Sequence, residues 1–231
     1  NEVDADQTGT DSAEFIELFD GGVGNTDLTG LSIVLYNGSD DLSYRAFDLD
    51  GLSTNATGYF VLCGNAGNTA NCDLDVSPDT NMLQNGADAV VLLTGDAVNF
   101  PNDSAQPASG VIDALVYDTS DPDDAGLLGL INPGQPQVNE GATSSASDSN
   151  GRCDNGTGGA LNTDTYSQGA PTPGEENDCG SPPIPGITLI SAVQGSGASS
   201  PFEGSTLTIQ GVVTAVFQGP DQIGGFTVQE E

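Results

Sequence analysis

Carboxylates crowd the first residues of the chain at a spacing that could support cation binding. Glu2, Asp4 and Asp6 alternate with other residues, and Asp11 and Glu14 follow closely. In an extended strand, alternate side chains point to one face about 7 Å apart, where like charges repel unless a cation or solvent screens them. Several carboxylate oxygens suit a hard cation such as Ca²⁺. We therefore expect a Ca²⁺ site drawing on Asp4, Asp6 and Asp11 or, as the simpler explanation, a solvated acidic strand edge.

Four cysteines could carry covalent chemistry, and they occur as two local pairs, Cys63 with Cys72 and Cys153 with Cys179. The chain has no His, so a zinc site would need all four thiolates, and no CxxC spacing supports one. An even number of cysteines in this pattern indicates two disulfides, which persist in oxidising compartments. We therefore expect an extracellular protein.

No apolar run approaches the roughly 20 residues of a membrane span, and without a leader pattern Asn1 is expected to be a mature or trimmed start.

The charge balance narrows the possible functions. The 231 residues include 34 acidic side chains and two basic ones, Arg45 and Arg152, for a formal net charge of −32. Such a field repels polyanions, so direct nucleic-acid binding is not expected. The acidic composition has two possible explanations. The carboxylates could keep the protein soluble in salty surroundings, or they could bind divalent cations. A carboxylate pair could cleave glycosidic bonds, but no Trp is present to form a sugar platform, so the chain is not expected to be an enzyme.

Short apolar runs bounded by Gly, Asn and Asp recur along the sequence, whereas helical periodicity is almost absent. Several runs are apolar on both faces, as expected of strands inside a sandwich. This pattern predicts an all-β, immunoglobulin-like sandwich. The predicted strands lie at about Asn1–Asp6, Glu14–Phe19, Ser32–Tyr36, Leu42–Asp48, Gly58–Cys63, Ala89–Thr94, Val98–Phe100 and Val111–Tyr117.

The second half of the chain has a different composition. Residues 118–181 are rich in Gly, Ser, Asn, Asp and Pro, and we expect an irregular, disulfide-stapled loop region pinned to the sandwich by the apolar run Leu127–Ile131. Residues 181–186 are predicted to form a stiff proline linker. The expected organisation is thus a sandwich over 1–180, a linker over 181–186 and an incomplete β module over 187–231. The strands predicted in this last module are Ile187–Val193, Ser205–Phe217 and Gly225–Gln229.

The opening segments carry a family resemblance. They read Asn1-Glu-Val-Asp-Ala-Asp6, then Gly9-Thr-Asp-Ser-Ala-Glu-Phe-Ile-Glu-Leu18, and then Asp27-Leu-Thr-Gly-Leu-Ser-Ile-Val34. This succession resembles the bacterial lamin tail domain, an immunoglobulin-like sandwich, although Leu31 stands where that family commonly has Trp. The resemblance implies the same fold here.

Later segments extend the resemblance over about residues 1–180. Gly151-Arg-Cys153, Ala170-Pro-Thr-Pro-Gly174 and Asn177-Asp-Cys179 are similar to the closing portion of lamin tail domains in secreted bacterial proteins. This similarity implies a bacterial, secreted or cell-surface protein.

The C-terminal segments resemble a different module. Ile190-Ser-Ala-Val-Gln-Gly-Ser-Gly197, Ser200-Pro-Phe-Glu-Gly204, Gly211-Val-Val-Thr214 and Gly225-Phe-Thr-Val-Gln-Glu-Glu231 are similar to the start of the oligonucleotide-binding-type region of ExeM-like extracellular nucleases. In that family a metal-dependent nuclease domain follows. The resemblance implies a parent nuclease whose catalytic residues lie outside this chain.

Two functions follow as expectations. The first is a non-catalytic targeting or scaffolding region of a secreted nuclease, with the downstream nuclease domain as its partner in cis. The second is a structural subunit of an extracellular filament or surface layer, in which the strands after residue 186 complete the sheet of another copy.

Overall fold

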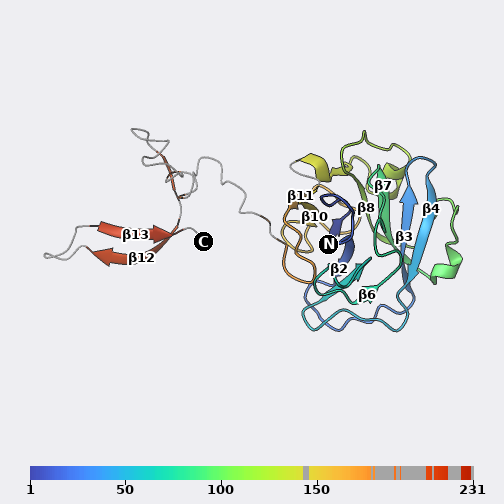
Figure 1. The fold of residues 1–231 in the computed structure, drawn as a ribbon, viewed down its shortest axis with the longest axis horizontal. Coiled ribbons are helices and arrows are strands. Elements are labelled where there is room, and N and C mark those ends of the chain that lie inside the picture. The colour runs from blue at the N-terminus through green and yellow to red at the C-terminus, as the bar shows by residue number, and fades with distance from the viewer. Residues whose placement is uncertain are drawn as a thin grey trace. The chain divides into compact units, whose positions relative to one another are not determined.

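The computed structural model describes residues 1–142, 146–177, 179, 190, 193, 207–209, 211–217 and 225–229. The chain divides into two compact units, Asn1–Cys179 and Gly180–Glu231 (Figure 1). The linker expected at 181–186 lies outside the described residues. Among the helices that the structure describes, none is long and apolar enough to cross a membrane.

Two mixed sheets build the first unit, which is an all-β sandwich, as the sequence predicts (Figure 1). The spatial order of the first sheet is β11 (Tyr166–Gly169), β10 (Ser149–Arg152), β1 (Glu2–Asp4), β2 (Phe15–Phe19), β5 (Tyr59–Cys63) and β6 (Leu74–Asp75). The second sheet has the order β4 (Leu42–Asp48), β3 (Leu31–Asn37), β7 (Asp88–Thr94), β8 (Val111–Asp118) and β9 (Val138–Asn139).

The main core lies between the two sheets. Strands β1, β2 and β5 contribute apolar side chains from one side, and β3, β7 and β8 contribute them from the other. Because side chains alternate along a strand, Ile33 and Leu35 of β3 enter this core while Val34 and Tyr36 point to the opposite face. All four side chains are completely buried. The outer face of the second sheet is therefore covered as well.

Loop segments pack on the outer faces of the two sheets. The short 3-10 helix η2 (Leu127–Leu130) packs on the second sheet, and Leu127 is completely buried there. This confirms the apolar run expected to pin the loop region. On the first sheet, Phe15 and Val61 pack with the Cys63–Cys72 disulfide.

The region from 118 to 181 is more regular than its composition suggests. It contributes β9, β10 and β11, and β10 pairs with β1 in the middle of the first sheet. The strand β10 was missed because its buried side chains are polar, so that no hydrophobic pattern marks it. Ser149 donates a hydrogen bond to Glu2, and Arg152 forms an ion pair with Asp113 at 2.7 Å.

The strand predicted at Val98–Phe100 is wrong. These residues overlap the 3-10 helix η1 (Ala97–Asn99), and the side chain of Val98 is 81% exposed. Of these three residues, only Phe100 packs against the apolar cluster on the outer face of the second sheet. The alternation of two apolar residues was therefore insufficient evidence for a half-buried strand.

The described part of the second unit contains an antiparallel pair, β12 (Val212–Phe217) and β13 (Gly225–Gln229), with a bulge between Val213 and Ala215. The strand expected at 225–229 is confirmed, and that expected over 205–217 begins only at Val212. Of the strand expected at 187–193 the structure describes Ile190 and Val193, and both are helical.

Candidate metal centre

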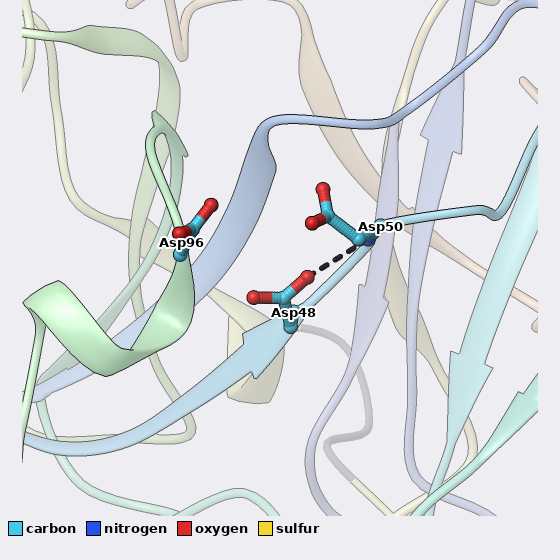
Figure 2. Close-up of side chains that lie close together, drawn as sticks. All are labelled: Asp48, Asp50 and Asp96. Carbon is cyan, nitrogen blue, oxygen red and sulfur yellow. Dashed lines mark hydrogen bonds between the residues drawn. The ribbon is translucent and has the colours of Figure 1, made fainter.

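Three aspartates from two separate parts of the sequence meet at one end of the second sheet (Figure 2). Asp48 ends β4, Asp50 lies in the turn after it, and Asp96 directly precedes η1. Each offers a carboxylate oxygen, and these oxygens all lie within 4.8 Å of one another. Among the described residues, this is the group of three carboxylates that meets the geometry of a metal site.

Backbone amides hold two of these carboxylates in place. Asp48 accepts hydrogen bonds from the amides of Asp50 at 2.9 Å and Ala97 at 3.1 Å, and Asp50 accepts one from Gly30 at 2.7 Å. Asp96 makes no side-chain capping bond to η1, and its carboxylate lies within reach of the other two. Ca²⁺ takes six to eight oxygen ligands, and exposed carboxylates leave room for the waters that complete such a shell. This arrangement can therefore hold a divalent cation at the surface.

The acids singled out by the sequence lie elsewhere, around two amide side chains. Gln7 Nε2 donates to Asp4 at 2.6 Å, whereas Asn85 Nδ2 contacts Asp11 at 3.1 Å and Asp6 at 3.4 Å. The strand β1 ends at Asp4, before Asp6, so the expected alternation over 1–6 is only partly formed. The Ca²⁺ site at Asp4, Asp6 and Asp11 remains a prediction.

Asp4 belongs to a buried cluster that includes Glu140, a residue the sequence analysis did not select. The Glu140 carboxylate is completely buried and accepts hydrogen bonds from the amides of Ala5 at 3.3 Å and Asp6 at 3.2 Å. These bonds divert the backbone from strand pairing. Burial, reinforced by the charge of Asp4, raises the pKa of Glu140 to about 9. Burial likewise raises the pKa of Asp4 to about 8, with Glu2, Glu14 and Asp11 adding repulsion.

Three further buried glutamates connect the first sheet to distant loops. Glu14 accepts hydrogen bonds from the amides of Met82 at 2.5 Å and Leu83 at 2.9 Å. Glu2 and Glu17 bind the 172–174 segment through its backbone amides at 2.9 and 2.6 Å. Burial raises the pKa of Glu14 and of Glu17 to about 7. These three glutamates are thus built into the fold and are not part of an open site.

Both predicted disulfides are formed, Cys63–Cys72 and Cys153–Cys179.

The two arginines form ion pairs or hydrogen bonds inside the first unit. Besides its ion pair with Asp113, Arg152 donates to the carbonyls of Thr157 and Gly159 at 2.9 Å each. Arg45 donates to the Met82 carbonyl at 3.2 Å.

The candidate cation site at Asp48, Asp50 and Asp96 could not be found from the sequence, because no spacing rule joins the end of a strand at Asp48 to Asp96, which lies 48 residues later. A weak signal existed in the Asp-x-Asp pair at Asp48 and Asp50.

No protein-family model matches this sequence, and neither a curated protein nor a solved structure is significantly similar to it.

Proposed function

We propose that this chain is the non-catalytic targeting and scaffolding region of a secreted nuclease, acting at the cell surface or in the extracellular matrix. Two observations support the proposal: the resemblance to the lamin tail domain, and the contacts between the first and last segments of the first unit. A targeting module must fold independently of the domain that it positions, and it must present that domain at a fixed place.

The observation that carries the proposal is the meeting of the first and last segments of this unit. Asn1 Nδ2 contacts the side-chain oxygens of Asn155 at 3.2 Å and Asn177 at 3.4 Å. Asn177 Nδ2 in turn donates to the Arg152 carbonyl at 2.9 Å, beside the disulfide of Cys153. A domain attached after this unit therefore leaves from a cross-linked, hydrogen-bonded junction.

The charge and the disulfides support the extracellular setting. Disulfides persist outside the reducing cytosol, and a net charge of −32 keeps a protein soluble where counterions screen it. A surface-held cation at Asp48, Asp50 and Asp96 fits the same setting, since exposed carboxylate sites bind Ca²⁺ at extracellular, not cytosolic, concentrations.

The test uses the chain fused to a fluorescent protein and added to washed cells and matrix of the producing bacterium. We expect the fusion to be retained on them while a DNA substrate with Mg²⁺ and Ca²⁺ stays intact. The fluorescent protein alone is the control. Removal of the fusion by a buffer wash, or cleavage of the DNA by the chain itself, would overturn the proposal.

A structural subunit of a filament or surface layer is the second candidate. It is favoured by β12, on which Val212 and Val213 are 48% and 51% exposed. A two-stranded sheet gains stability when a further strand pairs with it. Negative-stain microscopy and light scattering over rising concentration distinguish the two: fibres support the filament, and a constant monomer mass rules it out.

A further inference from the structure

We propose that a groove on the first unit binds an arginine side chain of a basic peptide. The groove has a volume of about 620 Å³ and lies where four segments meet: the end of β2, the turn before β5, and two loops of the C-terminal half. Its polar and aromatic lining comprises Phe19, Thr57, Tyr59, Asn155, Glu175 and Glu176. The inference rests on the proposed targeting function, to which it gives a partner chemistry.

An aromatic pair forms one wall of the groove. The rings of Phe19 and Tyr59 have centroids 4.7 Å apart and are tilted by 30°. Asn155 Nδ2 donates to the Tyr59 hydroxyl at 2.5 Å, which fixes that ring from the opposite loop. Tyr59 is itself buried, so the partly exposed ring of Phe19 is the surface on which a guanidinium group stacks, because the delocalised charge of that group is attracted to an aromatic face.

Two carboxylates form the acidic rim. Glu175 and Glu176 are exposed, and they follow Gly174, whose amide donates to the buried Glu17 at 2.6 Å. Gly174 has a φ of +78°, and a Cβ there would lie 2.5 Å from the Cβ of Asn71. The loop that carries the two glutamates is therefore fixed before any ligand arrives, which lowers the entropy lost on binding.

Among the described residues, neither Glu175 nor Glu176 forms a salt bridge. Both arginines are engaged elsewhere, Arg152 with Asp113 and Arg45 with a backbone carbonyl. Burial raises the pKa of the Tyr59 hydroxyl; the charge of the buried Glu17 adds to this effect, and the rim residues Glu176 and Glu175 contribute less. A partner must bring the positive charge. Arginine satisfies the rings and the carboxylates together, since its planar fork pairs with carboxylates while its face stacks.

The first experiment uses two blocked tripeptides, Gly-Arg-Gly and Gly-citrulline-Gly, titrated into the ¹⁵N-labelled full chain. Citrulline has the shape of arginine without the charge. We expect amide shifts centred on Tyr59, Asn155 and Gly174 with the arginine peptide, and binding at least about tenfold weaker with citrulline. Equal shifts with both peptides, or shifts spread over the acidic surface, would overturn the inference.

The second experiment compares charge-matched variants. Glu175→Gln/Glu176→Gln is expected to weaken the arginine peptide about fivefold, whereas Asp121→Asn/Asp123→Asn, which removes the same charge elsewhere, leaves affinity within about twofold. Equal weakening by both pairs would mean that only the overall field attracts the peptide. Failure of peptide binding does not alter retention of the fluorescent fusion on cells, so the groove and the targeting function fail separately.

Discussion

Raising the pH from about 5 to about 8 should destabilise the first unit, because the carboxyl groups of Asp4 and Glu140 are both buried. Their pKa values in the folded state are about 8 and about 9, whereas the ordinary values of these groups are 3.8 and 4.5. Between these limits the folded chain holds protons that the unfolded chain has lost. The stability is therefore complete below about pH 4 and is lost progressively as the pH rises through the folded-state values.

The magnitude follows from proton linkage. Each proton held only by the folded state lowers the free energy of unfolding by about 1.4 kcal/mol per pH unit. Asp4 and Glu140 each hold such a proton, so the loss between pH 5 and pH 7 is at most about 5.4 kcal/mol, of which Asp4 accounts for half. Glu14 and Glu17, with pKa values raised to about 7, act in the same direction. The lowered pKa of Asp20 acts in the opposite direction but below this range.

The assay is urea unfolding followed by circular dichroism at pH 5, 6, 7 and 8, for the wild type, Asp4→Asn and the exposed control Asp123→Asn. Asp4→Asn removes the ionisation and retains an acceptor for Gln7 Nε2. Between pH 5 and pH 8 the Asp4→Asn variant should lose about 1–3 kcal/mol less stability than the wild type loses. The Asp123→Asn variant should lose as much as the wild type. A wild type that gains stability from pH 5 to pH 8, or an Asp4→Asn variant with the wild-type slope, would refute the reasoning.

Three further predictions concern single contacts. Glu14→Ala should cost about 3–5 kcal/mol in urea unfolding, because the buried amides of Met82 and Leu83 lose their acceptor; a cost below about 1 kcal/mol would contradict this. Leu127→Ala should cost about 2–5 kcal/mol by the same measurement, since the side chain is completely buried, and an unchanged midpoint would mean that η2 does not hold its sheet. Ca²⁺ at about ten times its Kd should raise the Tm by about 3–6 °C relative to chelator, and Asp96→Asn should abolish the rise; a rise that persists in the variant would place the ion elsewhere.

The sequence was sufficient for the all-β class and for most strands of the second sheet. Runs such as Val90–Leu93 are apolar on both faces, and burial on both faces is what the structure shows for β3 and most of β7. Such apolar runs can be recognised in a sequence because burial of an apolar side chain is non-directional and needs no particular partner.

Polar burial was not predictable in the same way. Strand β10, Ser149–Arg152, has the composition of a loop and lies inside a sheet because partners distant in sequence satisfy its side chains. Glu140 was missed for the same reason, since only the folded chain brings it to the amides of Ala5 and Asp6. The acids at 4, 6 and 11 were noticed, but their burial and their amide partners depend on Gln7 and on Asn85 from another turn.

The central position of β1 has a consequence for the order in which the chain can fold. Glu2 pairs with Glu17 on one side and with Gly151 on the other, so the second neighbour of β1 is synthesised only after nearly the whole unit. The second sheet from β3 to β8 is complete in sequence by Asp118. Contacts between such distant segments are slow to form because a long loop must close first. A chain truncated before β10 would keep an unpaired edge on β1, a ready template for aggregation.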